Sequence, residues 1–125
     1  MIQKDKDLLL QDLCARLPYG VKISIDDDIP ILLNQISYSD GYVGGNNECY
    51  SLKCFVIKPY LFPLSNMTEE QKEEFTIVQS QRYTGLYPYP SQCSKVLNWL
   101  HKNHFDYKGL IEKGLAIDAT GLNIY

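Results

Sequence analysis

The residues best suited to chemistry are a cysteine and two histidines in the last third of this 125-residue chain, Cys93, His101 and His104. A cysteine in the first turn of a helix can have a lowered pKa, because the helix dipole favours the thiolate. Cys93 takes that position in a predicted helix. His101 lies about 12 Å further along it, at a rise of ~1.5 Å per residue, so it cannot serve as the base. Catalysis would need a base from elsewhere in the fold, and the alternative places Cys93 in the apolar stripe of its helix.

Zinc binding is the second chemistry that these residue types suggest. Four residues separate Cys49 from Cys54, and two separate His101 from His104, which approaches the spacing of zinc ligands. Positions five apart on a regular strand point to opposite faces, so the two cysteines converge only if a bulge or turn intervenes. The long gap between Cys54 and His101 also departs from the zinc-finger pattern. We therefore expect free thiols, no bound metal and no cofactor.

Two charged segments suggest other ligands. The triplet Asp26 to Asp28 could bind a divalent cation, since hard cations take carboxylate oxygens, but consecutive side chains in a turn rarely converge. A solvated turn is the preferred interpretation. A basic patch with stacking aromatic rings could bind nucleic acid, although acidic neighbours dilute it. That patch comprises His101, Lys102, Lys108 and Lys113, with Trp99, Phe105 and Tyr107.

Tyrosine is the most over-represented residue, with ten in the chain. Tyr83, Tyr87 and Tyr89 lie in a segment that glycine and proline interrupt, where at least one is expected to be exposed. Tyrosine offers a large contact area with few rotatable bonds and is enriched in interfaces. Trp99 lies beside the main apolar stripe of its helix, so it either widens the core face or contacts a partner. These four residues are candidate partner-binding residues; the alternative is that tyrosines fill a small core with their hydroxyls at the surface.

The first half of the chain is predicted to form one helix followed by short strands. A helix over residues 5–16 carries one apolar stripe, formed by Leu10, Leu13, Cys14 and Leu17. The period then changes to two, which predicts strands over 21–26, 29–38, 42–43 and 48–58. Short antiparallel strands of this number indicate a small bent sheet, and an SH3-like barrel is one form that such a sheet takes. The prolines after residue 58 exclude a regular helix or a central strand there.

The second half is predicted to be helical. Thr68 and Gln71 fit a capping box that begins a helix over 69–79. A second helix follows over 91–103. Asp106 would cap a short third helix, which Gly114 would end in a left-handed conformation.

These elements define an α+β fold with an N-terminal helix, a small bent antiparallel sheet and three helices in the C-terminal half. At this length one domain is expected over residues 1–125. Its first part, 1–63, holds the helix and the β unit. Its second part, 64–125, is helical, with a connector rich in tyrosine and proline near 80–90.

Composition limits the class of partner. A net charge of −3 and a pI near 5.3 give no overall attraction to nucleic acid or anionic lipid. The first residues are too acidic for a secretory signal, and no run approaches the ~18 apolar residues of a membrane-spanning helix. Four cysteines without a signal favour a reducing cytoplasm and free thiols. We expect a cytoplasmic protein that does not enter membranes.

A resemblance to a known family rests on three blocks: "DLCARLPYGVKI", "VIKPYLFPLSNMTEEQ" and "LNWLHKNHFDYKGLIEKGLAIDA". They resemble blocks of a family of small uncharacterised proteins encoded in genomes, prophages and mobile elements of gut Bacteroides. That family shows the same order of helix, variable β segment, "KPYL" hinge, "MTEE" helix, variable insert and final "HFDY" block. The resemblance implies a bacterial or phage origin and a cytoplasmic setting. The family has no established activity, so it implies no catalytic residues.

Three functional hypotheses follow. The favoured one is a small non-catalytic accessory module that binds a protein partner. The alternative is a ligand- or metal-dependent activity in a cleft between the sheet and the C-terminal helices, with Cys93, His101 and His104 as its residues. Nucleic-acid binding is third, and an enzyme is not expected.

Overall fold

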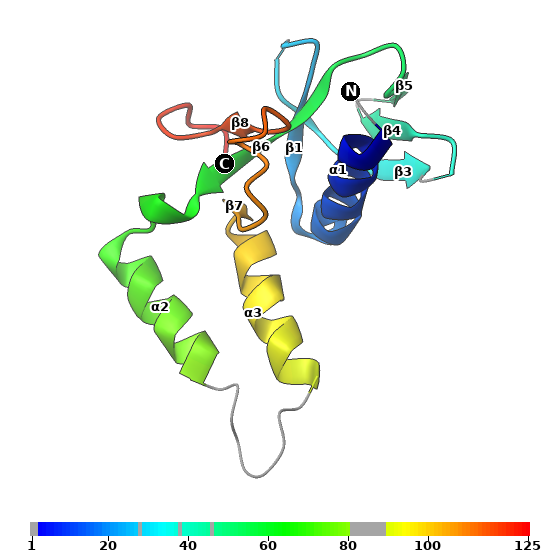
Figure 1. The fold of residues 1–125 in the computed structure, drawn as a ribbon. Helices are drawn as coiled ribbons and strands as arrows, with labels where there is room; N and C mark the ends of the chain where they lie inside the picture. The colour runs from blue at the N-terminus through cyan, green and yellow to red at the C-terminus, as the bar shows by residue number, and fades with distance from the viewer. Residues whose placement is uncertain (1–2, 28, 38, 46, 81–89) are drawn as a thin grey trace.

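Helix α1 packs against two small sheets, and helices α2 and α3 run away from them side by side (Figure 1). This computed structural model describes residues 3–27, 29–37, 39–45, 47–80 and 90–125, without the side chains of 79–80 and 90–95. The helices are α1 (Gln3–Arg16), α2 (Glu69–Ser80) and α3 (Pro90–Lys102), and 3₁₀ turns span Leu17–Tyr19 and Leu64–Asn66. The strands are β1 (Lys22–Ile25), β2 (Ile31–Leu32), β3 (Gln35–Ser37), β4 (Tyr42–Gly45), β5 (Glu48–Ser51), β6 (Ile57–Pro63), β7 (Phe105–Asp106) and β8 (Ile117–Asp118). The predicted α+β class is confirmed.

Strand β6 organises the larger sheet, which has five strands. It pairs antiparallel with β1, which pairs with β2, and it pairs parallel with both β7 and β8. The smaller sheet is an antiparallel meander of β3, β4 and β5. Neither sheet closes, so no SH3-like barrel is found in the described part of the chain. The strand predicted over 48–58 is interrupted by a turn, and β6 takes its remaining partners from the C-terminal segments.

The prolines of β6 do not prevent it from being a central strand, and the expectation to the contrary was wrong. The Val56 carbonyl accepts from the Asp26 N–H (2.7 Å), so even-numbered residues of β6 turn their backbone groups toward β1. Leu61 points the other way, and its carbonyl is bound from the β8 side. Pro59 and Pro63 are odd-numbered, so their missing N–H groups face the edge that lies away from β1. The ladder with β1 therefore loses no donor.

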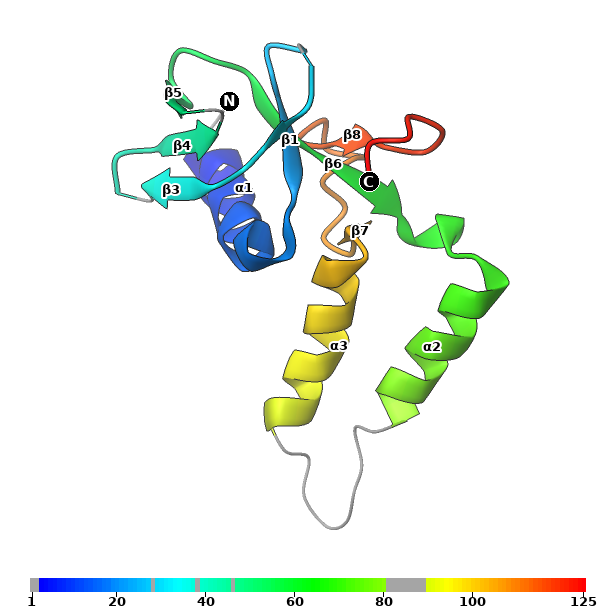
Figure 2. The same cartoon turned by 180° about the vertical axis from the view of Figure 1, so that it is seen from behind.

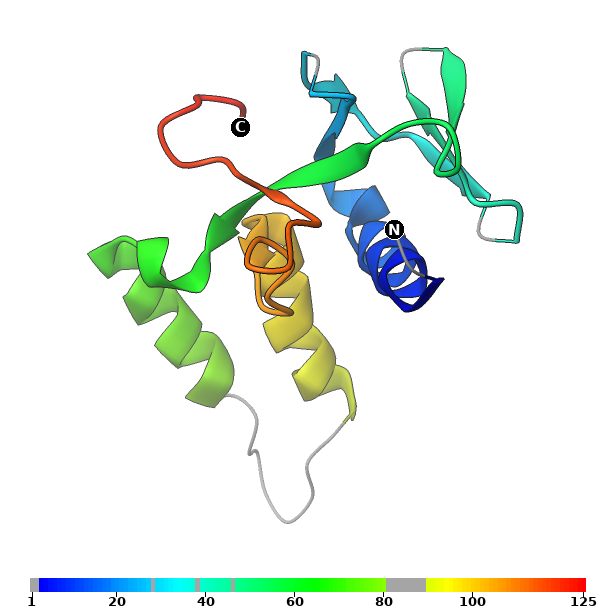
Figure 3. The ribbon, with the colours of Figure 1, turned by 45° about the horizontal axis from the view of Figure 1, so that its top comes forward.

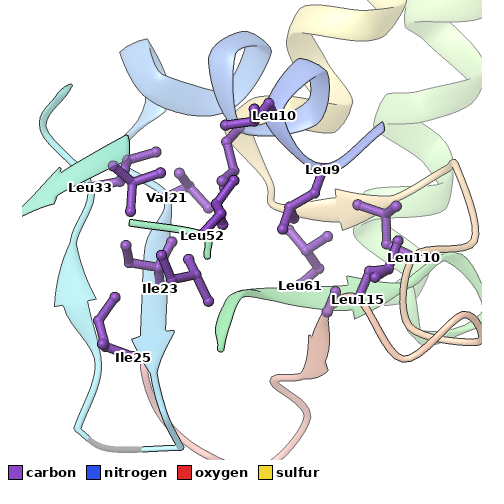
Figure 4. Close-up of a cluster of buried hydrophobic side chains, with 14 residues drawn as sticks. Leu9, Leu10, Val21, Ile23, Ile25, Leu33, Leu52, Leu61, Leu110 and Leu115 are labelled. Carbon is purple, nitrogen blue, oxygen red and sulfur yellow. The ribbon is translucent and has the colours of Figure 1, made fainter. Parts of the chain in front are cut away.

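The hydrophobic core lies between α1 and the larger sheet. Leu9 of α1 points toward Leu61 of β6, beside Leu110 and Leu115 from the C-terminal segment (Figure 4). Leu10, the next residue of α1, lies near Val21, Leu33 and Leu52, and Ile23 of β1 belongs to the same buried cluster (Figure 4). The buried face of α1 differs from the predicted stripe. Cys14 is exposed, and the ionisable Asp12 and Arg16 are buried in its place.

Helices α2 and α3 form a hairpin whose connection lies outside the described residues (Figure 2). The predicted capping box is confirmed: the Gln71 N–H donates to Thr68 Oγ1 (3.1 Å), and the Thr68 N–H donates to Gln71 Oε1 (3.0 Å). Phe75 of α2 meets the ring of Trp99 edge to face, with centroids 5.2 Å apart. Ile77 is 57% exposed, so α2 is a surface helix. None of the described helices combines the length and apolarity needed to cross a membrane.

The predicted third C-terminal helix is replaced by turns, which is a correction. The C-terminal signal nevertheless forms, whereas Asp106 binds N–H groups further along the chain than an N-cap residue does. The Asp106 carboxylate accepts from the N–H groups of Leu110 and Ile111, both at 3.0 Å. Gly114 has φ +75°, its N–H donates to the Ile111 carbonyl, and the Leu115 N–H donates to the Leu110 carbonyl. This is the Schellman pattern. β7 ends at Asp106 and β8 begins at Ile117, and both strands pair with β6. Pairing therefore fixes both ends of the segment between them, which forms a turn that ends at Gly114.

Candidate functional site

A buried ion pair joins α1 to the C-terminal segment. Asp12 and Arg16 lie one turn apart on α1, and both are 0% exposed. Arg16 Nε donates to Asp12 Oδ2 at 2.8 Å, and Arg16 Nη2 donates to the Phe105 carbonyl of β7 at 2.6 Å. Asp12 Oδ1 and Arg16 Nη1 are buried without a hydrogen-bond partner in the described structure. The pair therefore links residues that are far apart in the sequence.

An aromatic layer covers this pair. The guanidinium of Arg16 lies 5.5 Å from the ring centroid of Tyr107, and Lys108 Nζ lies 5.7 Å from the same centroid. The Tyr107 hydroxyl is 2.6 Å from Nε2 of His101, which is 5% exposed. The His101 ring also lies near Tyr19, with centroids 6.0 Å apart. His101 thus lies between Tyr107 and Tyr19, within the electrostatic influence of the Arg16 guanidinium.

The electrostatics of the cluster favour neutral histidine. Burial lowers the pKa of His101 to about 4, and the positive charges of Arg16 and Lys108 add to the effect. Burial also raises the pKa of the Tyr107 hydroxyl, so that group keeps its proton at neutral pH. Burial raises the pKa of the Asp12 carboxyl, while the adjacent Arg16 opposes that rise. A base with a pKa near 4 is a weak proton acceptor at pH 7.

The second predicted histidine belongs to a different contact. His104 has φ +61° and its ring stacks on Tyr125, with centroids 3.6 Å apart. The Tyr125 hydroxyl accepts from the Lys22 N–H (2.8 Å) and donates to the Tyr60 carbonyl (2.8 Å), so it bridges β1 and β6 where the two strands separate. The segment after β8 curls back to reach this point (Figure 3). Burial lowers the pKa of His104 to about 4 and raises that of Tyr125 to about 12.

The other predicted chemistries are not assembled in the described residues. Cys49 and Cys54 are exposed on the β side of the molecule, and the described chain contains no group of three or more metal-ligating side chains. Cys93 lies in α3, but its side chain is outside the described part. Asp26 Oδ1 accepts from the Val56 N–H at 2.7 Å, so this carboxylate closes a turn. Asp28 is outside the described residues.

The cluster around Arg16 is best interpreted as a brace. Each of five grooves on the described surface, of about 150 to 520 Å³, is lined by residues other than Arg16, His101 and Tyr107. The hydrogen bonds that the cluster makes run instead between its own side chains and to a backbone carbonyl. His101 and the residues that follow it, which were the main candidates for chemistry, therefore hold the C-terminal segment against α1.

A groove that shares no residue with the Arg16 cluster is better placed to bind a ligand. It has a volume of about 490 Å³ and lies between the turn that joins β1 to β2 and the strand β5. Apolar side chains line it, among them Ile31, Tyr50 and Phe55, and Ile29 at its border is 72% exposed. Its volume falls within the range of about 300–1,000 Å³ that is usual for ligand sites. We call this feature the turn groove.

The candidate partner-binding residues separate into two groups. Trp99 is half-buried: its ring stacks on Phe105, with centroids 5.6 Å apart, and its Nε1–H donates to Glu74 Oε2 at 3.3 Å. It therefore joins α2, α3 and β7. Tyr83, Tyr87 and Tyr89 lie outside the described residues, so their role as a contact surface stays a prediction.

The sequence interpretation missed Asp12 and Arg16. A signal for them exists, because Leu9, Asp12, Leu13 and Arg16 follow the i, i+3, i+4, i+7 spacing of one helix face, and opposite charges four apart can pair. The turn groove had no such signal, since its walls come from three separate segments.

Comparison with known proteins gave no relative: the chain matches no family model, no curated protein and no solved structure. The resemblance to the Bacteroides family stays a prediction.

Proposed function

We propose that this chain is a small non-catalytic module that binds a protein partner, and that it acts as an accessory protein in the cytoplasm of a bacterium or in a phage or mobile element. The observation that carries the proposal is the turn groove. Apolar side chains form part of its lining, and one of them, Ile29, is 72% exposed. Val56, which is 50% exposed, follows the lining residue Phe55 in the chain. Exposed apolar groups that cluster beside a groove are a feature of interaction sites.

The location of the groove also supports a binding role. The described residues of its walls lie in or next to β1, β2 and β5, which are paired in the two sheets. The Asp26 N–H and the Val56 carbonyl, and the Val56 N–H and the Asp26 carboxylate, form reciprocal hydrogen bonds that tie the turn to the segment entering β6. A partner that fills the groove would therefore meet a preformed surface and would pay little ordering entropy.

Site-specific photo-cross-linking in the host tests this proposal. A benzophenone amino acid is introduced at Ile29, which borders the groove, at Tyr87, in the predicted tyrosine contact segment, and at Leu122, a 50% exposed control that does not line the groove. We expect one discrete protein adduct from Ile29 that is absent from Leu122. The adduct should disappear when Phe55 is changed to Ser in the same chain, since that change removes an apolar wall.

Other results would redirect the proposal. An adduct from Tyr87 alone would assign partner binding to the connector and reject the groove. Adducts of the same pattern at all three positions, or at none, would contradict a specific protein-binding role.

A further inference from the structure

The turn groove is lined by charged side chains as well as by apolar ones. Three carboxylates, those of Asp26, Asp27 and Glu48, line it, and its described lining includes no lysine or arginine. Within the described residues the ion pairs are Arg16–Asp12 and Lys72–Glu69. The groove therefore presents negative charge that no cation of the described chain neutralises, beside apolar side chains.

An aromatic pair forms the wall beside these carboxylates. The rings of Tyr50 and Phe55 meet edge to face, with centroids 5.3 Å apart and an interplanar angle of 89°. The Tyr50 hydroxyl donates to Glu48 Oε2 at 2.8 Å, which holds that carboxylate at the aromatic wall. An aromatic face beside carboxylates attracts organic cations, because the ring quadrupole and the negative charges act in the same direction.

We infer that the turn groove binds a lysine or arginine side chain presented by an extended segment of the protein partner. The aliphatic part of such a side chain packs on Ile31 and the aromatic pair, and its cationic end meets Asp27 and Glu48. The inference rests on the proposed function and names the chemistry of the partner. A purely apolar segment satisfies only one of the two features of the groove, and an acidic segment is repelled by its carboxylates.

The three carboxylates are not equally suitable for a test. Asp26 accepts a backbone hydrogen bond and is part of the turn. Asp27 is exposed and has φ +60°, a conformation that asparagine adopts readily, so Asp27→Asn removes the charge without strain. Glu48→Gln keeps an acceptor for the Tyr50 hydroxyl. The matched control is Glu112→Gln, which removes one exposed carboxylate that does not line the groove.

The experiment titrates the full isotope-labelled chain with four capped tripeptides and follows backbone amide shifts by NMR. The peptides are acetyl-Val-X-Val-amide, with X lysine, arginine, norleucine or glutamate. We expect saturable shifts at Asp27 and Tyr50, with the lysine peptide bound at least about fivefold more tightly than the norleucine peptide. Asp27→Asn/Glu48→Gln should abolish this ratio, and Glu112→Gln should retain it. Raising the salt from about 0.05 M to about 0.5 M should reduce the ratio in the unmodified protein.

Each contrary result has a distinct meaning. Equal binding of the lysine and norleucine peptides at the groove overturns the cationic ligand and leaves the proposed function standing. No groove shifts with any peptide, or preferential binding of the glutamate peptide, also overturns the inference, and the cross-linking at Ile29 then decides the proposed function separately.

Discussion

The buried pair of Asp12 and Arg16 allows a quantitative prediction about stability. Changing Arg16 to Met keeps an unbranched apolar stem, shorter than the arginine side chain, and removes two charged hydrogen bonds, at 2.8 Å to Asp12 and 2.6 Å to the Phe105 carbonyl. It also leaves the Asp12 carboxylate buried without its cation. Breaking a buried pair in this way costs about 3–5 kcal/mol. With a urea m-value of about 2 kcal/mol/M, the unfolding midpoint should fall by about 1.5–2.5 M.

The double variant Asp12→Leu/Arg16→Met is the control for this prediction. It removes both charges, so no uncompensated ion remains, and only the Phe105 carbonyl loses its donor. An unsatisfied buried acceptor costs about 1–3 kcal/mol, so we expect the double variant to be more stable than Arg16→Met alone. The two variants also differ in pH dependence. Loss of Arg16 removes the influence that lowers the pKa of Asp12, which burial already raises.

The sign of that pH dependence follows from linkage. A carboxyl whose pKa is raised by folding destabilises the protein once the pH exceeds its unfolded value of about 3.9. The stability of Arg16→Met relative to the double variant should therefore fall from pH 4 toward pH 7, with a slope of up to about 1.4 kcal/mol per pH unit. A loss below about 1 kcal/mol for Arg16→Met, as expected for an exposed pair, would refute the reasoning, as would a double variant that is less stable than the single one.

Three further predictions concern the C-terminal segment. Tyr125→Phe deprives the Lys22 N–H of its partner, so unfolding should show a loss of about 0.5–1.5 kcal/mol; unchanged hydrogen exchange at Lys22 would contradict this. Gly114→Ala should lower the free energy of unfolding by about 1 kcal/mol, because φ is +75° while the added Cβ meets open space. Gly114→Asn should lower it by less. A loss above about 3 kcal/mol for either variant would show steric crowding instead. The imidazoles of His101 and His104 should titrate by NMR with a pKa of about 4, so stability should fall as the pH drops from about 6.5 toward 4; titration near 6.5 would show that neither ring is desolvated.

Local signals in the sequence predicted the local structure well. The capping box of Thr68 and Gln71 and the left-handed Gly114 need only neighbouring residues, and both form where they are expected. The ends of α1 and α3 lie within two residues of the predicted ranges 5–16 and 91–103.

Structure that depends on distant partners was not predictable in this way. β7 and β8 have two residues each, too few to show a period, and they form only because β6 offers them an edge. Without that information the segment between them reads as a helix. Arg16 shows the same limit for the site: its spacing from Asp12 is visible in the sequence, but the carbonyl that it binds lies 89 residues away.

The central position of β6 has a consequence for synthesis of the protein. About 56 residues separate Pro63 from Ala119, and a ribosome adds them in about 3–11 s at about 5–20 residues/s. During that time one edge of β6 has no partner strand, because β8 and Ala119 have not yet been synthesised. Pro59 and Pro63 both lack an N–H on that edge, so a neighbouring nascent chain finds few donors to pair with. The prolines that argued against a central strand in the sequence thus protect β6 from intermolecular pairing until the C-terminal segment of its own chain is synthesised.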